Sequence, residues 1–139
     1  MKKYKILFFD IETNAIDFWP TLDGLKDLHC ISIFDPGRAK MHSFSSNAGN
    51  LDEGVAMLND SHNICGHNAI NFDAPALGKL GYEVTPRVVD TKVMSQVIHP
   101  DLFTEDCRRG EEFPKQLRGR HSLKAWGLRL GNEKDDHGA

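Results

Sequence analysis

The chain has 139 residues, of which 40% are hydrophobic and 27% are charged, and its formal net charge at pH 7 is −3. This length and composition are typical of one globular domain over residues 1–139 with enough apolar residues to bury a core. The slightly negative charge excludes a global basic field of the kind that favours tight, non-specific DNA binding. An enzyme that holds its substrate through divalent cations remains possible, because such ions supply positive charge themselves.

The cysteines and the apolar segments predict the compartment. Cys30, Cys65 and Cys107 are scattered and form no CxxC pair, which is typical of proteins in a reducing cytoplasm. No apolar stretch has the length that a bilayer requires. Met1 is followed by a short apolar run that ends at Asp10, so we expect neither a signal peptide nor a membrane partner.

The first 99 residues carry alternating strand and helix patterns. The unbroken apolar run before Asp10 predicts a buried strand, and Asp35-Pro36-Gly37 predicts a turn between two paired strands. In chain order we predict strands over 5–10, 29–35 and 40–44, a helix over 52–59, a strand over 63–67, a helix over 72–80, a strand over 87–90 and a helix over 91–99.

The remaining residues contain one clear helix. The segment 101–120 has no periodicity and carries five basic residues, which predicts a long, mobile, basic loop that either contacts nucleic acid or is merely solvated. Ser122 is placed to cap a last helix that Gly131 ends. The predicted order indicates an α/β fold, a mixed sheet with an antiparallel edge and helices on both faces. The expected core includes Phe8, Ile31, Ile33, Leu77 and Trp126.

Two acidic residues close the first predicted strand. Asp10 and Glu12 are two positions apart, so strand alternation places both carboxylates on one face and turns Ile11 toward the core. Neighbouring carboxylates repel each other unless a cation lies between them, and oxygen ligands without sulfur favour Mg²⁺ or Mn²⁺. The alternative is that both acids are solvated where the strand ends.

A second polar group lies at a junction between a strand and a helix. Asn68 and Asp73 flank this junction, and such junctions are where open α/β sheets bind their ligands. The alternative for Asp73 is an acid in the first turn of a helix, interacting with the helix dipole, with Asn71 as the N-cap. The two interpretations are compatible.

Several segments in order resemble one enzyme family. Phe8-Phe9-Asp10-Ile11-Glu12-Thr13 and the segment from Gly66-His67-Asn68 to Phe72-Asp73-Ala74-Pro75-Ala76-Leu77 resemble the first two motifs of DnaQ-like (DEDD) 3′→5′ exonucleases. Asp90-Thr91 and residues 119–131 add a resemblance to the proofreading domain of family A DNA polymerases from short-tailed bacteriophages. The resemblance covers almost the whole chain and implies a ribonuclease H-like fold.

The resemblance also implies roles for individual residues. It implies two divalent cations, Mg²⁺ or Mn²⁺: Asp10 would bridge both, Glu12 would complete one site, and Asp73 would hold the other. Thr13, Asn68 and Phe72 would position the terminal nucleotide.

The third motif of that family has no counterpart here. It requires a Tyr or His followed a few residues later by a fourth metal-binding Asp, and no Tyr or His in this sequence has an Asp four or five residues after it. We therefore expect a domain without its C-terminal portion. Asp135 and Asp136 in the polar tail are weak substitutes for the missing ligand.

The expected activity is metal-dependent hydrolysis of the terminal phosphodiester of single-stranded DNA, with release of nucleoside monophosphates. Without the third motif, we expect the chain alone to be a poor enzyme. One alternative is an impaired module that binds nucleic-acid ends or a polymerase partner without cutting. Another is a small exonuclease completed by a further chain. A phage-encoded protein of this kind would act in the cytoplasm of the infected bacterium.

Overall fold

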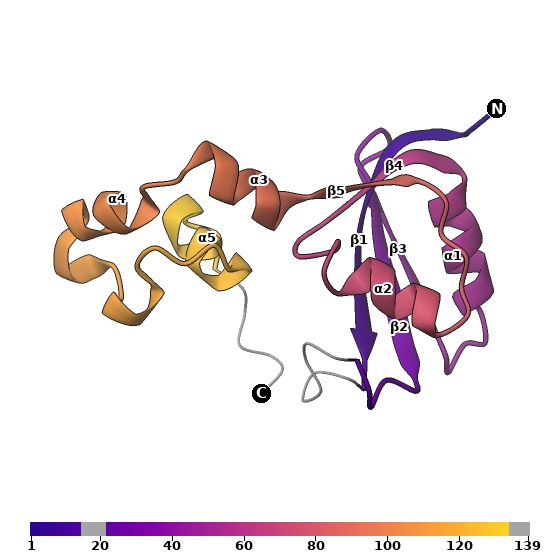
Figure 1. Cartoon of the computed structure of the whole chain (residues 1–139). Helices are drawn as coiled ribbons and strands as arrows, with labels where there is room; N and C mark the ends of the chain where they lie inside the picture. The colour runs from indigo at the N-terminus through magenta and orange to yellow at the C-terminus, as the bar shows by residue number, and fades with distance from the viewer. Residues whose placement is uncertain (15–21, 134–139) are drawn as a thin grey trace. The chain divides into compact units, whose positions relative to one another are not determined.

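The computed structural model describes residues 1–14 and 22–133, which fall into two compact units, Met1–Thr91 and Lys92–Ala139 (Figure 1). We call them unit 1 and unit 2, and each is described by itself. The expectation of a single domain over 1–139 stays a prediction.

The described residues of unit 1 form a five-stranded mixed sheet in the order β3-β2-β1-β4-β5. Strands β1 and β2 pair in antiparallel fashion, as do β2 and β3, whereas β4 runs parallel to β1 and β5 runs parallel to β4. The predicted mixed sheet with an antiparallel edge is therefore confirmed. The strands are β1 (Tyr4–Thr13), β2 (Leu28–Asp35), β3 (Lys40–Ser45), β4 (Ser61–Gly66) and β5 (Arg87–Asp90).

Helices α1 (Leu51–Asn59) and α2 (Asp73–Lys79) pack on the same face of this sheet. Their apolar side chains share one buried cluster with the inward residues of the strands. The cluster includes Leu7, Phe9, Ile11, Ile31, Ile33, Val55, Leu58, Ile64, Ala76 and Leu77. The expectation of helices on both faces of the sheet stays a prediction.

The predicted core is correct except at two aromatic residues. Ile31, Ile33 and Leu77 are fully buried, but Phe8 is 39% exposed and Phe9 takes its place at 6%. The reason is strand alternation, because Leu7, Phe9 and Ile11 turn toward the helices while Phe8 turns to the opposite face. A continuous apolar run hides this alternation. Trp126 is partly buried.

Unit 2 is helical, and the predicted loop over 101–120 is wrong. This segment contains a helix, α4 (Leu102–Arg108), and two 3₁₀ turns, Gly110–Glu112 and Lys115–Leu117. They follow α3 (Thr91–Ile98) and precede α5 (Leu123–Leu130). At seven residues α4 is too short to show a helical period, and one of its two buried residues is the acid Asp106.

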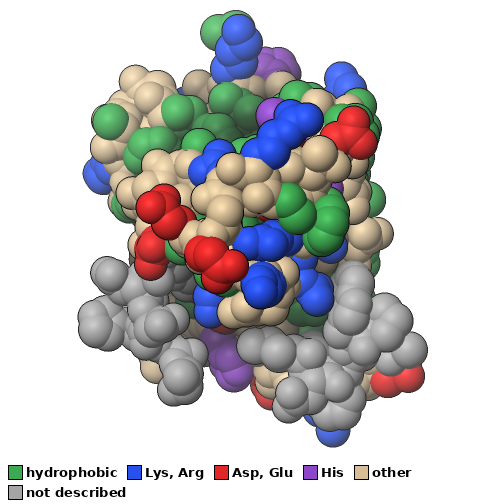
Figure 2. All heavy atoms as spheres, turned by 90° about the vertical axis from the view of Figure 1, so that its left-hand side faces the viewer, with side chains coloured by type: hydrophobic (Ala, Val, Ile, Leu, Met, Phe, Trp, Pro, Cys, Tyr) green, Lys and Arg blue, Asp and Glu red, His purple; other side chains and the backbone are tan. Residues whose placement is uncertain are grey.

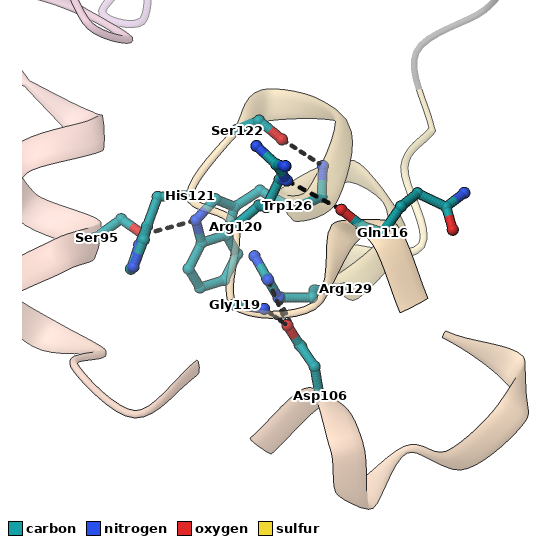
Figure 3. A network of polar contacts seen from close by, with 10 residues as sticks. Ser95, Asp106, Gln116, Gly119, Arg120, His121, Ser122, Trp126 and Arg129 are labelled. Carbon is teal, nitrogen blue, oxygen red and sulfur yellow. Dashed lines mark hydrogen bonds and ion pairs between the residues drawn. The ribbon is translucent and has the colours of Figure 1, made fainter. Parts of the chain in front are cut away.

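A buried ion pair holds α4 against α5 (Figure 3). The Arg129 guanidinium donates to both oxygens of Asp106, at 2.9 Å and 2.6 Å, and the backbone N–H of Gly119 donates to the same carboxylate at 2.8 Å. The guanidinium also lies over the rings of Phe113 and Trp126. These contacts fix a segment whose sequence alone indicates a mobile loop.

The N-cap and the end of α5 agree with prediction. Ser122 Oγ accepts a hydrogen bond from the backbone N–H of Ala125 at 3.2 Å, and Gly131 ends the helix in the left-handed conformation at φ 66°. Left-handed backbone favours glycine.

A second group of polar contacts in unit 2 involves His121. The Trp126 indole donates to Ser95 Oγ at 2.7 Å, and Ser95 Oγ shares a further hydrogen bond with His121 Nδ1 at 2.6 Å (Figure 3). Burial lowers the pKa of His121 below 6.5, and the charges of Arg129, His99 and Lys92 lower it further.

We expect the stability of unit 2 to fall as the pH drops below about 6.5. The unfolded chain binds a proton at His121 near its ordinary pKa, whereas the folded chain resists protonation. The contribution is therefore present above that pKa and is lost as the pH falls. Thermal unfolding between pH 8 and 5.5 should show a smaller loss for His121→Gln than for wild type. His29→Gln, on an exposed side chain, is the control. Equal pH dependence in wild type and His121→Gln contradicts the prediction.

Candidate functional site

Three parallel strands of unit 1 end at the same edge of the sheet. Asp10 and Glu12 lie near the end of β1, Gly66 ends β4, and Asp90 ends β5 in register with Gly66. The carboxyl ends of strands in open α/β sheets are where ligands bind. The helix that follows β4 begins with Asp73 at this edge.

Close packing brings the end of β4 against β1. A side chain at Gly66 would place its Cβ atom 2.9 Å from the Cβ atom of Ala69 and 3.2 Å from the backbone oxygen of Phe9. Real Cβ atoms essentially never come within 3.0 Å of another atom, so any larger residue at position 66 would force Ala69 to shift. The chain can therefore turn directly beside β1 and carry Asp73 to the neighbourhood of Asp10.

The side chains of Asp10 and Glu12 are both exposed, and Ile11 between them is 5% exposed and faces the core. The predicted alternation is confirmed. Cys30 of β2 pairs in register with Glu12. Burial raises the pKa of the Cys30 thiol, and the charges of Glu12 and Asp10 raise it further. This edge of the sheet is therefore a region of negative potential.

Asp73 is the most perturbed acid of the site. Its side chain is buried, at 4% exposure, and its pKa is raised from 3.8 to about 7. Burial is the largest cause, and the neighbouring Asp10 carboxylate is the second. Hydrogen bonds from the backbone N–H groups of Ile11 and Asp73 itself oppose the rise. Asp73 and Asp10 thus form an electrostatically coupled pair of carboxyl groups although they lie far apart in sequence.

The alternative interpretation of Asp73 was an acid in the first turn of a helix with Asn71 as the N-cap, and only its first part is confirmed. Asp73 does lie in the first turn of α2, but Asn71 is not the N-cap. Phe72 occupies that position without a side-chain cap, and the Asn71 amide donates instead to Asn68 Oδ1 at 3.4 Å. The chain enters α2 through a turn that begins at Asn68, and the N-cap therefore lies one residue later than expected, at Phe72.

The three residues predicted to position a nucleotide lie in different structural environments. Thr13 is buried on the helix-covered face of β1, at 7% exposure, and Phe72 is partly buried and packs against the core. Asn68 adopts the left-handed conformation at φ 62°, which asparagine tolerates better than most residues other than glycine. Their roles toward a substrate stay predictions.

Within residues 1–14 and 22–133, the structure brings no three His, Cys, Asp or Glu side chains together in an arrangement that could hold a metal ion. Asp10, Glu12 and Asp73 therefore do not form a ready three-ligand cluster in this conformation. Asp135 and Asp136 lie outside the described residues.

Asp90 is a further acid at this edge of the sheet, which the sequence indicated only through the resemblance of the Asp90-Thr91 pair. It is buried at 3% exposure, and its carboxylate accepts hydrogen bonds from the backbone N–H groups of Asn68 and Ile70. The signal in the sequence is an acid at the end of a strand parallel to β4, which sheet topology places beside the turn after β4.

The basic segment of unit 2 carries exposed cations on folded backbone. Arg108, Arg109, Lys115 and Arg120 are exposed. Figure 2 shows several Lys and Arg side chains gathered near the middle of one face, with Asp and Glu side chains beside them. Contact of this segment with nucleic acid stays a prediction.

Comparison with known proteins places the chain beside phage DNA polymerases. It is 33% identical over 140 residues to the DNA-directed DNA polymerase of Escherichia phage T7, a match that covers 92% of this chain and 19% of the polymerase. The polymerase of Enterobacteria phage T3 is 31% identical over 144 residues, with 95% and 20% covered. The chain is thus homologous to a segment of these enzymes and spans about a fifth of their length. No family model matches it.

The chain also matches the solved structure of a family B DNA polymerase from the archaeon Pyrobaculum calidifontis. The match covers 89% of this chain and 21% of the polymerase chain. The TM-score is 0.46 and the sequence identity is 15%, which does not establish a shared fold. Among the described residues, no helix has the length and apolar character needed to cross a membrane.

Proposed function

We propose that the chain is a DnaQ-like 3′→5′ exonuclease domain of the proofreading type, which hydrolyses single-stranded DNA ends and releases nucleoside monophosphates. The observation that carries the proposal is the coupled pair of Asp10 and Asp73 at the carboxyl edge of the sheet, with the pKa of Asp73 raised to about 7. Strongly perturbed carboxyl groups in such a position are typical of catalytic or metal sites.

The topology supports the finer fold assignment. An antiparallel β1–β2–β3 meander followed by the parallel strands β4 and β5 is compatible with a ribonuclease H-like sheet. The homology to phage DNA polymerases adds support, because a polymerase context suits an enzyme that removes nucleotides from a strand end.

The chemistry of these acids suits a divalent cation. A positive charge between Asp10 and Asp73 would offset the repulsion that raises the pKa of Asp73, and the ligands are carboxylate oxygens, which suit Mg²⁺ or Mn²⁺. We assign Glu12, on the same face of β1 as Asp10, as the further ligand. Asp10, Glu12 and Asp73 would hold such ions, which would supply Lewis-acid stabilisation of the charge that develops on the phosphodiester.

The protein itself would place the strand end. In the sequence, Thr13 directly follows the acids of β1, and Asn68 and Phe72 precede Asp73. These three residues would supply backbone, amide and aromatic contacts for a terminal nucleotide. The chain offers no Tyr or His before a fourth Asp to orient the attacking water. Proton transfer by such a group contributes about 10²–10⁴-fold to a rate, so the proposed activity is slow.

One observation favours a second candidate function. The described residues hold no ready three-ligand metal cluster, and this suits a module that binds strand ends or a polymerase partner without cutting.

Release of nucleotide from a 3′-labelled single strand tests the proposal. We expect slow release with Mn²⁺, lost in Asp10→Ala and retained in Asp35→Asn, an acid at the far end of β2 that serves as a control away from the site. Equal release by wild type and Asp10→Ala would mean that the proposed site does not cut. Binding of the strand without release by wild type supports the binding module instead.

A further inference from the structure

The turn between β4 and α2 determines where Asp73 lies, and its backbone is unusual. Asn68 has a positive φ of 62°, a conformation that is uncommon outside glycine, although asparagine adopts it more readily than most residues. Such a conformation persists when surrounding contacts enforce it. We call residues 67–72 the entry turn.

Asp90 supplies these contacts from the neighbouring strand. Its Oδ1 accepts the backbone N–H of Asn68 at 2.9 Å, and its Oδ2 accepts the backbone N–H of Ile70 at 3.0 Å. Both oxygens of one carboxylate are therefore directed at the entry turn, and hydrogen bonds to a charged acceptor are roughly twice as strong as neutral ones.

The next residue reinforces the same turn. Thr91 Oγ1 lies 2.9 Å from His67 Nδ1 and 3.4 Å from the backbone oxygen of Gly66. The end of β5 therefore contacts the chain at both the beginning and the middle of the entry turn.

Backbone hydrogen bonds connect the entry turn to the first turn of α2. The N–H of Phe72 donates to the carbonyl of Asn68 at 3.0 Å, and the N–H of Ala74 donates to the carbonyl of Ala69 at 2.9 Å. Ala69 is fully buried. Asp73 lies between these two donors, so the backbone that Asp90 fixes is the backbone that orients the Asp73 side chain.

From these contacts we infer that Asp90 is a positioning residue: it fastens the entry turn and thereby holds Asp73 beside Asp10 for the cation. This inference rests on the proposed function for its metal and goes beyond it, because Asp90 itself is not assigned as a ligand. Residues that orient metal ligands typically change metal affinity by about 10–100-fold when they are replaced.

The test compares Asp90→Asn with Asp35→Asn, an equally buried acid at the end of β2 that also accepts a backbone N–H, from Gly37 at 2.9 Å. Asparagine offers one acceptor oxygen and a donor, so one bond to the entry turn is lost. In Asp90→Asn we expect amide hydrogen exchange at Asn68 or Ile70 to accelerate about tenfold or more. Calorimetry should show an Mn²⁺ affinity weaker by roughly tenfold. Asp35→Asn should change neither quantity.

A rescue variant separates positioning from a direct electrostatic effect. Glycine adopts positive φ readily, so Asn68→Gly added to Asp90→Asn should restore part of the Mn²⁺ affinity without restoring the lost charge. No recovery overturns the positioning role. Thr91→Val is a milder second variant if Asp90→Asn fails to fold, and it should loosen the same amides in the same direction.

The outcomes distinguish this inference from the proposed function. Unchanged exchange at Asn68 and Ile70, or faster exchange with unchanged Mn²⁺ affinity, overturns the role of Asp90. If wild type takes up no Mn²⁺, the proposed function fails. Amide hydrogen exchange at residues 68–74 of Asp90→Asn then still tests whether Asp90 fastens the entry turn. Protection equal to that of wild type overturns this role, and lost protection supports it.

Discussion

Replacing Phe9 with alanine should lower the free energy of unfolding of unit 1 by about 3–5 kcal/mol, the usual cost of truncating a buried phenylalanine. Phe9 is 6% exposed, lies in the central strand of the sheet, and pairs in register with the fully buried Ile33. Its ring also packs at Gly66, where β4 turns toward the candidate site. The cavity would therefore open at the centre of the core.

The matched control is Phe8→Ala, one residue earlier in the same strand. Phe8 is 39% exposed, and its ring has a tilted contact with Phe34 at a centroid distance of 6.5 Å. We expect a loss of about 1 kcal/mol, the common size for a point mutation outside the core. Urea denaturation followed by far-UV circular dichroism measures both variants. Losses of equal size would show that the helices do not cover the Phe9 face.

This pair of residues shows what the sequence can and cannot predict about the fold. The hairpin of β2 and β3 and the short β5 were predictable, because turn residues and strand alternation are local signals. The assignment of Phe8 to the core was wrong because the apolar run from Ile6 to Phe9 was interpreted as buried on both faces. Alternation from Ile11, which was correctly predicted to face the core, already places Phe9 and not Phe8 on that face.

The missed helix α4 has a different cause. Its buried residues are Leu102 and Asp106, and an acid at a buried position argues against a core helix when it is considered alone. Asp106 is stable there because Arg129, from a helix later in the chain, donates two hydrogen bonds to it. A pattern within the segment cannot show such a partner.

The residue types of the candidate site could be predicted from the sequence, whereas their arrangement in space could be predicted only in part. Alternation along β1 was enough to place Asp10 and Glu12 on one face. The burial of Asp73 and its coupling to Asp10 depend on how β4 and α2 pack against β1, and the bonds from Asp90 depend on the pairing of β4 with β5. These are consequences of the tertiary structure.

Replacing Asp73 with asparagine should stabilise the metal-free protein at pH 8. The folded pKa of Asp73 is about 7 and its ordinary value is 3.8, so the folded state binds the proton more tightly than the unfolded state does. The stability that this group contributes is then fully present below pH 3.8 and is lost as the pH rises through about 7. This difference corresponds to at most roughly 4 kcal/mol. The asparagine side chain carries no charge, so the variant avoids that loss.

Urea denaturation at about pH 5 and about pH 8 in the presence of a chelator measures the effect, because these values lie on either side of the folded pKa. Asp73→Asn should exceed wild type by much more at the higher pH than at the lower pH, because the loss in wild type grows from pH 3.8 until the pH passes about 7. Asp35→Asn is a control of opposite sign, because Arg38 holds the pKa of Asp35 below its ordinary value and its charged form stabilises the fold. That variant should be less stable than wild type at the higher pH.

Manganese then links this stability difference to the proposed chemistry. A cation that binds the ionised Asp10 and Asp73 stabilises the folded state by about 2.7 kcal/mol at roughly one hundred times its dissociation constant. Wild type should gain this stability at about pH 8 and lose most of the gain at about pH 5, where the proton holds Asp73. Asp73→Asn should gain much less at either pH. If added Mn²⁺ stabilises the variant and wild type equally at the higher pH, the ion binds elsewhere, and the buried carboxyl group of Asp73 is then an acid of the core and not a ligand.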